Sequence, residues 1–337
     1  MKIGIIEEKI IQPDITKAEI EAEWENIMKL MPDSEIMLKF TDRYPATPAE
    51  MDDFTDDCDA LFGVWITESL FTEEFFLRHP RLKYVATLGH GYESFDYDLA
   101  KRYGVTVTNT VYGSQTIAEY AFALLMDTCH HINIHDEHIH QTDWSLLENR
   151  SDFCKALTPQ IELYGKTIGV VGLGAIGFAF AKMANGFGMN VVSYSRTKKA
   201  GEEYSFVKQL DSLDELLSIS DIISLHLPEN GNAHVINEAS IRKMKDGVIM
   251  INTARGILID ESAMAAALRS GKVRACAVDV LEGEPPINGS PLLSAPHCTI
   301  TGHIAWLTRE SRFRAIRMAL DNYQSYINGH PVSVINK

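Results

Sequence analysis

Positive charge is scarce in this sequence. Its 337 residues include 31 Lys and Arg against 46 Asp and Glu, a formal net charge of −15 at pH 7. A surface of this sign repels nucleic acid and anionic membranes, so we expect neither as a general partner. An anionic cofactor or substrate would therefore need a local basic pocket.

Paired cysteines and long apolar runs are missing too. The 5 cysteines are scattered, with no C-x-x-C pair to indicate a disulfide framework or a zinc knuckle. No apolar run approaches the roughly 20 residues that span a bilayer. The opening MKIGIIEEKI has too short an apolar core and too many acids for a signal peptide. We expect a cytoplasmic protein.

What the sequence does contain is an alternation of short apolar runs and helical spacing. A chain of 337 residues is too long for one ordinary core, so two domains are expected. Strands that alternate with helices predict parallel sheets, hence two Rossmann-like or flavodoxin-like α/β domains with an active-site cleft between them. A single long helical pattern over residues 114–140 joins the two series. The strands are expected at residues 2–6, 36–40, 60–64, 82–88 and 105–108, and at 168–171, 190–193, 222–225, 248–252 and 273–278.

A glycine-rich turn opens the second series. Gly172, Gly174 and Gly177 have G-x-G-x-x-G spacing between a buried-strand pattern and a helical pattern. Such glycines allow a tight turn, close approach of a pyrophosphate, and close packing of the helix on the strand. Glycines also gather in ordinary turns, but here strand, glycines and helix occur in the order that dinucleotide binding requires. The predicted cofactor-binding residues are Gly172, Leu173, Gly174, Ala175, Ile176 and Gly177.

The choice of cofactor is made at the end of the next strand. An Asp or Glu about 20 residues after the glycines would bind the ribose 2′-OH of NAD. This chain instead has Ser195, Arg196 and Thr197 there, followed by two lysines. Cations bind a 2′-phosphate, so the sequence favours NADP(H) over NAD(H). The alternative is a solvated basic loop.

Three further strand ends carry charged side chains. Arg255 follows the strand at 248–252, and its planar guanidinium can hold a carboxylate and polarise a carbonyl, although a structural salt bridge is an equal alternative. Glu284 and His303 follow the last strands and could pair, since a carboxylate on one ring nitrogen makes histidine a competent proton donor. An isolated histidine is more often a packed residue.

From about residue 82 to the C-terminus the chain resembles the D-2-hydroxyacid dehydrogenases. The matching segments are Gly89-His90-Gly91, residues 109–119, V-V-G-L-G-A-I-G, S-D-I-I-S-L-H-L-P, I-N-T-A-R-G, D-V-L-E-G-E-P and G-H-I-A-W. Within this family, the segments 152–167, 187–197 and 303–311 look most like the glycerate dehydrogenase/hydroxypyruvate reductase group. The resemblance implies a substrate domain of residues 1–112 plus 307–337, a dinucleotide-binding domain of residues 113–306, and a homodimer formed through the long helical region.

The resemblance also implies roles at matching positions. Arg255 would hold the substrate carboxylate and keto oxygen, and His303 would transfer the proton with Glu284 orienting its ring. The substrate loop would be Gly89, His90, Gly91 and Tyr92, and further residues lining the cofactor would be His226, Pro228, Thr253, Ala254 and Asp279.

We therefore expect an enzyme that transfers hydride between NADP(H) and a small 2-keto acid of the hydroxypyruvate or glyoxylate type. One alternative is an NAD-dependent relative acting on D-lactate or bulkier acids. Another is a nucleotide-sensing binding protein without catalysis, which the fold alone does not exclude. No metal is expected: the spacing of His131, His135 and His138 would suit one, but a solvated or subunit-facing helix explains it better.

Overall fold

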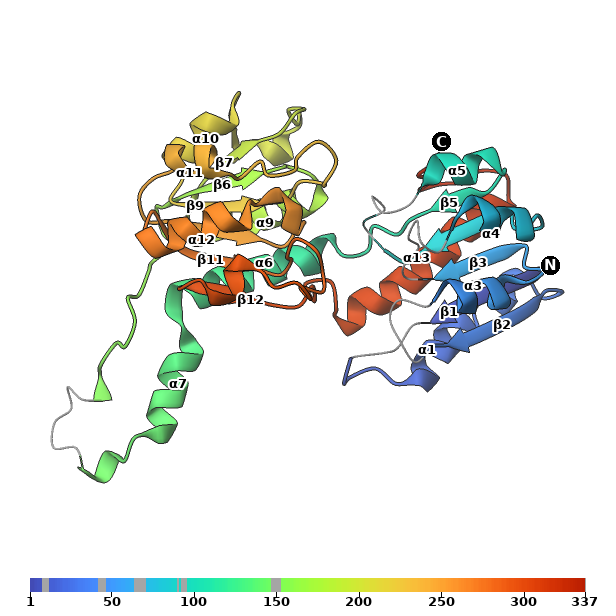
Figure 1. Ribbon diagram of the computed structural model, residues 1–337, viewed down its shortest axis with the longest axis horizontal. Helices are drawn as coiled ribbons and strands as arrows, with labels where there is room; N and C mark the ends of the chain where they lie inside the picture. Colours follow the sequence, from blue (N-terminus) through green and yellow to red (C-terminus); the bar gives the residue numbers. More distant parts are fainter. Residues whose placement is uncertain are drawn as a thin grey trace. The chain divides into compact units, whose positions relative to one another are not determined.

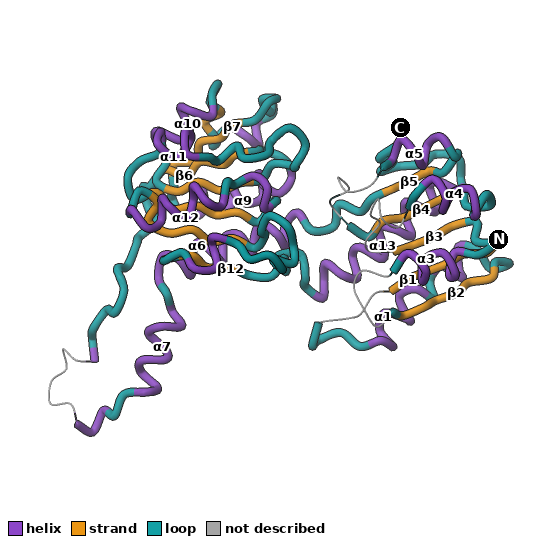
Figure 2. The backbone as a smooth tube through the Cα atoms, viewed as in Figure 1, coloured by secondary structure: helices purple, strands orange, loops and turns teal. Residues whose placement is uncertain are grey.

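The computed structural model describes residues 1–7, 12–41, 47–63, 71–89, 91, 96–146 and 153–336. It divides into two compact units. Unit 1 comprises Met1–Gly113 with Leu307–Lys337, and unit 2 comprises Ser114–Trp306. Each unit is built on its own parallel sheet (Figure 1 and Figure 2), which confirms the prediction of two α/β domains with parallel sheets.

Unit 1 has a five-stranded sheet in the order β2-β1-β3-β4-β5, with all neighbours parallel. This order is that of flavodoxin-like folds. Its central strands are buried on both faces, as parallel strands covered by helices are. The strands are β1 (Lys2–Glu7), β2 (Glu35–Phe40), β3 (Ala60–Gly63), β4 (Tyr84–Thr87) and β5 (Thr106–Thr108). The helices are α1 (Lys17–Trp24), α2 (Ile27–Leu30), α3 (Pro48–Thr55), α4 (Glu73–Arg78), α5 (Tyr97–Arg102) and α13 (Arg309–Ile327).

The last helix, α13, belongs to unit 1 because its apolar face completes that core. Ile316 and Tyr323 are fully buried, and the ring of Tyr323 packs edge-on against Phe62 at 5.3 Å. The C-terminal segment after the helix returns to β5, where the Asn336 side chain accepts the Val107 N–H at 2.9 Å. Burial of this face against the sheet is the main reason that the helix stays docked.

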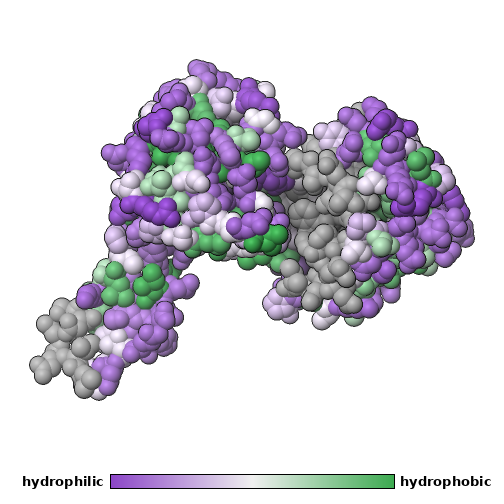
Figure 3. Space-filling view, viewed as in Figure 1, coloured by the Kyte–Doolittle hydropathy of each residue, from purple (hydrophilic) through white to green (hydrophobic). Residues whose placement is uncertain are grey.

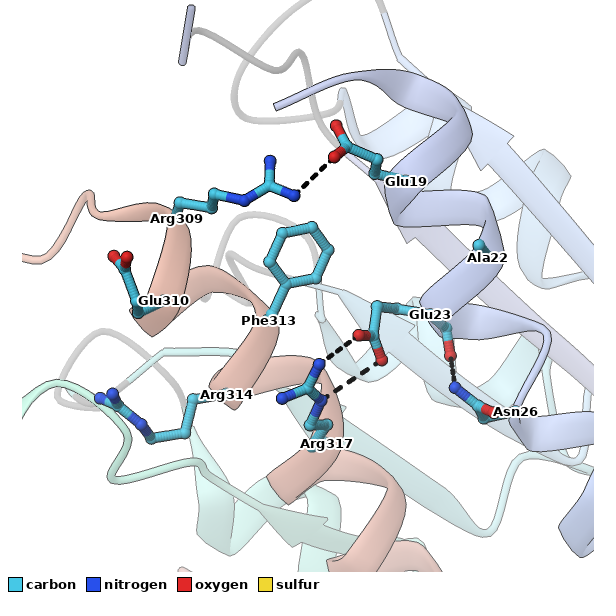
Figure 4. A pocket seen from close by; sticks show the side chains of 9 residues that line it. All are labelled: Glu19, Ala22, Glu23, Asn26, Arg309, Glu310, Phe313, Arg314 and Arg317. Atoms are coloured by element: carbon cyan, nitrogen blue, oxygen red, sulfur yellow. Dashed lines mark hydrogen bonds and ion pairs between the residues drawn. The ribbon is translucent and has the colours of Figure 1, made fainter. Parts of the chain in front are cut away.

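Ion pairs add to this packing along α1 and α13 (Figure 4). Arg309 binds Glu19 at 2.5 Å and Arg317 binds Glu23, on the walls of a surface pocket of about 630 Å³. These pairs are largely exposed and contribute little each. A third pair, Arg312 with Glu7, is buried. Burial raises the pKa of Glu7, and Arg312 and the Trp24 N–H oppose that rise.

Unit 2 has a seven-stranded sheet in the order β12-β11-β10-β9-β6-β7-β8, again parallel throughout. The chain order reverses between β6 and β9, which is the switch point where α/β sheets bind ligands. The strands are β6 (Thr167–Val171), β7 (Asn190–Tyr194), β8 (Lys208–Gln209), β9 (Ile222–Leu225), β10 (Val248–Asn252), β11 (Val273–Val278) and β12 (Cys298–Ile300).

Two apolar cores cover the faces of this sheet. One is formed with α6 (Ser114–His130) and α9 (Ala175–Gly186). The other is formed with α10 (Leu213–Ile219), α11 (Glu238–Lys243) and α12 (Glu261–Ser270). None of the helices in the described ranges is both long and apolar enough to cross a bilayer.

The structure corrects two of the predicted helices. The pattern over 114–140 is broken at His131, whose φ of 47° is left-handed, and a separate helix α7 (Ile132–Gln141) follows. The break falls where packing ends, because α6 buries many side chains and α7 buries none. Residues 15–31, whose apolar spacing also predicts one helix, instead form α1 and α2, and between them the Asn26 side chain donates to the Glu23 carbonyl at 3.0 Å beside the Asn26 N–H at 3.3 Å.

Candidate active site

The glycine turn of unit 2 lies at the switch point between β6 and β9. Gly172 has a φ of +97°, and a Cβ there would lie 2.5 Å from the His226 carbonyl oxygen. A Cβ on Gly177 would lie 2.0 Å from the Gly172 carbonyl oxygen. Gly174 begins α9 without a side-chain cap, and the space above it is open. The first N–H groups of a helix have no partner within the helix, so the uncapped N-terminus of α9 suits a pyrophosphate.

The residues after β7 contact this turn. The Leu173 N–H donates to Ser195 Oγ at 2.6 Å, and the Gly172 N–H donates to the Tyr194 carbonyl at 2.8 Å. Ser195 therefore fixes the strand end against the glycines. Arg196 and Thr197 are exposed, and of the first residues of α9, Ala175 is exposed and Ile176 is half-buried. Lys198 forms an ion pair with Asp211 at 2.5 Å.

His226 lies beneath the turn. Its Nε2 is 2.9 Å from Ser224 Oγ, and its ring packs on Phe180. Burial lowers the pKa of His226 to about 3, so the imidazole stays neutral near pH 7. Pro228, two residues on, is exposed. Thr253 lies at the end of β10, and its buried Oγ1 has no hydrogen-bond partner among the described residues, which a bound polar group would satisfy.

Arg255 is carried by a turn that Asn252 organises. The Asn252 side chain accepts the Ala254 N–H at 3.0 Å and donates to the Arg255 carbonyl at 2.8 Å. Gly256 follows in close contact with the next loop, since a Cβ there would lie 2.0 Å from the carbonyl carbon of Leu281. The fully buried Asn252 was missed in the sequence. A polar residue ending a buried strand is the signal that could have found it.

Glu284 and His303 contact each other. His303 Nδ1 lies 2.6 Å from Glu284 Oε2, and the Leu281 N–H donates to Glu284 Oε1 at 2.7 Å. Burial raises the pKa of Glu284, but the hydrogen bond and charge of His303, the Leu281 N–H and the charge of Arg255 together bring it below its usual value. The carboxylate is thus held in its ionised form, beside the imidazole and within the field of the guanidinium.

Asp279 fixes the loop that carries His303. Its carboxylate accepts the Thr301 hydroxyl at 2.5 Å and the N–H groups of Ile304 at 3.0 Å and Ala305 at 2.7 Å. Its carbonyl accepts the His303 N–H at 2.7 Å. The structure therefore gives Asp279 a role in loop geometry that the sequence did not suggest, and its predicted place lining the cofactor stays a prediction.

The remaining predicted residues lie outside unit 2. Gly89 follows β4 in unit 1, where its N–H donates to Thr87 Oγ1 at 3.3 Å and its carbonyl accepts the Thr110 N–H at 3.2 Å. Gly91 is half-buried. His90 and Tyr92 lie outside the described residues, so their predicted contacts with substrate remain predictions.

The histidines near α7 contact a glutamine. His130 Nδ1 lies 3.1 Å from Gln160 Oε1, and His135 Nε2 lies 3.2 Å from Gln160 Nε2. Within the described ranges, no three His, Cys, Asp or Glu side chains converge as a metal site would require.

Comparisons with known proteins agree with this geometry. The family model described as "D-isomer specific 2-hydroxyacid dehydrogenase, NAD binding domain" matches residues 122–305. A hydroxypyruvate reductase from Blautia hydrogenotrophica is 40% identical over 276 residues, which are 81% of this chain and 84% of that protein. A glyoxylate reductase from Aeropyrum pernix is 34% identical over 261 residues, 77% of each chain. Among solved structures, an acyclic imino acid reductase in complex with NADPH and D-Arg matches with a TM-score of 0.80 at 28% identity, covering 99% of this chain and 100% of that one.

The chain belongs to the D-isomer specific 2-hydroxyacid dehydrogenase family. The predicted family and enzyme class are thereby confirmed: it is an NAD(P)-dependent oxidoreductase that acts on the CH–OH group of its donors. The matched segment contains the glycine turn, Arg255, Glu284 and His303.

Proposed function

We propose that this protein is an NADP(H)-preferring reductase of small 2-keto acids, with hydroxypyruvate and glyoxylate as its preferred substrates. The observation that carries the proposal is the 2.6 Å contact between Glu284 and His303, in the same unit as the glycine turn. The names of two relatives, a hydroxypyruvate reductase and a glyoxylate reductase, support the choice of substrate.

The reaction would divide among three side chains. Bound NADPH supplies the hydride that reduces the keto carbon. Arg255 binds the substrate carboxylate and polarises the keto oxygen, as a guanidinium with several donors can. His303 transfers a proton from Nε2 to that oxygen, and Glu284 on Nδ1 holds the ring in orientation and stabilises its protonated form. In oxidation the same nitrogen takes the proton back.

The first test is a panel of 2-keto acids, each with NADPH and with NADH, followed by the loss of absorbance of the reduced cofactor. We expect the highest kcat/KM with hydroxypyruvate or glyoxylate and NADPH. Faster turnover of pyruvate or bulkier acids would replace this proposal with a D-lactate-type activity. If no 2-keto acid oxidised NADPH, a nucleotide-sensing role would be the better account.

The role of His303 has its own test. His303→Ala should lose most turnover while NADPH binding, followed by fluorescence titration, is retained. General acid catalysis typically contributes about 100-fold to 10,000-fold, so a loss in that range is expected. His234→Ala is a matched control, because His234 pairs with Glu282 and not with Glu284. Unchanged turnover of His303→Ala would exclude the assignment.

Preference for NADP(H) would rest on Arg196 and Thr197. Arg196 is exposed beside the turn, whereas Lys198 is held by Asp211. The double change Ser195→Asp with Arg196→Ala should lower the ratio of NADPH to NADH efficiency, because it removes a cation and adds the acid that NAD binding favours. Lys198→Ala serves as the control and should change the ratio less. A ratio that does not move in the double variant would contradict the preference.

We further propose that the protein is a homodimer that uses α7. That helix buries none of its side chains, and Ile132 and Ile134 are 65% and 46% exposed. Figure 3 shows a hydrophobic patch at the upper end of the arm that carries α7, with mostly hydrophilic surface below it. Exposed apolar surface of this kind marks interaction sites.

A further inference from the structure

Glu261 is a buried acid that the proposed reaction does not use. It is the first residue of α12, and only 6% of it is exposed. Its Oε1 accepts the Glu282 N–H at 2.8 Å, and its Oε2 accepts the Ser290 hydroxyl at 2.5 Å. These two donors lie at the two ends of the loop 282–290, which carries Glu284.

The helix itself does not need this carboxylate. The cap of α12 is Asp260, whose side chain accepts the Ala263 N–H at 3.0 Å. Glu261 forms no ion pair with a cation in the part of the chain that the structure describes. Burying an ionised carboxylate is costly unless hydrogen bonds compensate it, and both bonds of Glu261 come from the loop. Its contacts are therefore directed to the loop and not to its own helix.

The charged groups around this loop are few. The Glu282 side chain points to His234, with 3.1 Å between Oε2 and Nε2. Glu284 lies beside His303 and in the field of Arg255. On the side of Glu261, its charge acts to raise the pKa of the thiols of Cys276 and Cys298. None of these groups replaces Glu261 as an acceptor for the loop.

The loop is fixed just before Glu284 and at both ends. Just before the loop, the backbone of Gly256 approaches the backbone of Leu281 closely because Gly256 has no Cβ. The N–H of Leu281 in turn donates to the Glu284 carboxylate. At Glu282 and Ser290, Glu261 supplies the contacts. Without them, the loop would be held through Leu281, through Glu284 itself and through the contact of the Glu282 side chain with His234.

We propose that Glu261 is a positioning residue of the reaction: by binding both ends of the loop 282–290, it holds the Glu284 carboxylate against Nδ1 of His303. The inference rests on the proposed function, in which this pair supplies the proton. It assigns Glu261 no contact with substrate or cofactor.

The experiment compares four variants of the full chain. Glu261→Ala removes both contacts, and Ser290→Ala removes one. Glu261→Gln keeps an acceptor for the Glu282 N–H and can donate its amide to Ser290. The control is Glu238→Ala, which changes an exposed acid on α11 that pairs with Arg242. For each variant, kcat and KM for hydroxypyruvate, the Kd of NADPH, and the pH dependence of kcat/KM are measured.

For Glu261→Ala we expect kcat to fall by about tenfold to a hundredfold, the cost of a small misplacement of a reacting group. The Kd of NADPH should stay unchanged, because the glycine turn is not touched. The alkaline limb of the pH profile should move to lower pH, since His303 is then less well stabilised in its protonated form. Glu261→Gln should restore most of kcat, Ser290→Ala should lie between, and Glu238→Ala should match the unaltered protein.

Two results would overturn the inference. One is a folded Glu261→Ala variant with unaltered kcat and pH limb. The other is a parallel loss of NADPH affinity and kcat with no shift of the limb, which a general loss of structure would give. If Glu261→Ala does not fold, Ser290→Ala decides in the same way. Activity retained by His303→Ala would instead refute the proposed function, so the two failures are distinguishable.

Discussion

Replacing Glu284 by glutamine should shift the pH dependence of reduction. The change keeps the shape of the side chain and an acceptor for the Leu281 N–H, but it removes the charge beside His303. Hydrogen bonds to charged groups contribute about 1.5–3 kcal/mol. The Glu284 side chain is 32% exposed, so solvent screens the pair and the lower end of that range applies. Since one pH unit corresponds to 1.36 kcal/mol, we expect a shift of about one unit.

The sign of the shift follows from the contact. The pKa of Glu284 is lowered, despite its burial, chiefly by the hydrogen bond and charge of His303. Coupling is reciprocal, so the carboxylate stabilises the protonated imidazole by the same interaction. Glu284→Gln removes the negative charge that faces the imidazole and with it this interaction. The alkaline limb of kcat/KM for reduction must therefore move to lower pH, while in oxidation activity at low pH should increase.

The assay is the initial rate of hydroxypyruvate reduction with NADPH at low substrate, measured from acidic to alkaline pH in buffers of constant ionic strength. Glu282→Gln is the matched control: it removes a neighbouring acid that pairs with His234 and leaves His303 untouched. Superimposable limbs for Glu284→Gln and the unaltered protein, or a shift toward higher pH, would refute the reasoning.

Three further predictions concern the cofactor turn, unit 1 and assembly. Gly177→Ala would place a Cβ 2.0 Å from the Gly172 carbonyl, so the turn must move, and isothermal titration should show NADPH bound more weakly by at least about tenfold. Arg312→Ala leaves Glu7 buried and unpaired, and urea unfolding should show a loss of about 3–5 kcal/mol. Ile132→Glu places a charge on the exposed face of α7 and should convert a dimer to a monomer in sedimentation experiments.

Each of these three has a control. The control for the turn is Gly186→Ala. Gly186 lies in α9 where an added Cβ would meet open space, so this change should leave NADPH binding unchanged. Glu7→Gln combined with Arg312→Met removes both charges and should restore much of the stability lost in Arg312→Ala. Lys182→Glu changes charge in unit 2 away from α7 and should leave the mass unchanged. A control that behaved like its partner variant would contradict the corresponding argument.

The strand pattern could be predicted because most strands of both sheets are buried apolar runs. Strands β6, β9 and β10 are fully buried or nearly so, and the sequence predicted the bounds of each to within one residue. The edge strands β8 and β12 were missed, since two or three residues are too short to show a period. The break at His131 had no local signal either: it depends on where the packing of α6 on the sheet ends.

Some residues of the candidate site could likewise be predicted from the sequence, and others could not. Gly172 to Gly177 could be found because the turn is local, and its spacing reflects backbone geometry. Arg255, Glu284 and His303 could be proposed because the carboxyl ends of parallel strands share one edge of the sheet. Asn252 could have been proposed as a polar residue that ends a buried strand, whereas Glu261 could not, because its contacts are with a loop that begins 21 residues after it. Glu261 in particular has the sequence signature of an ordinary acid in the first turn of a helix.

A negatively charged protein must still bind an anionic substrate. The acids near the carboxyl edge of the unit 2 sheet show how the repulsion between their charges and an anion is reduced. The carboxylates of Asp279 and Glu261 each receive at least two hydrogen bonds from loops, and Glu284 receives one from Leu281 and one from His303. Donors that face a carboxylate offset its charge locally, much as a helix N-terminus offsets a phosphate. The negative charge is thus used to fix the loops that carry His303 and Glu284. Because donors partly offset these carboxylates, the guanidinium of Arg255 meets less opposing charge at the strand ends than the net charge of −15 would imply.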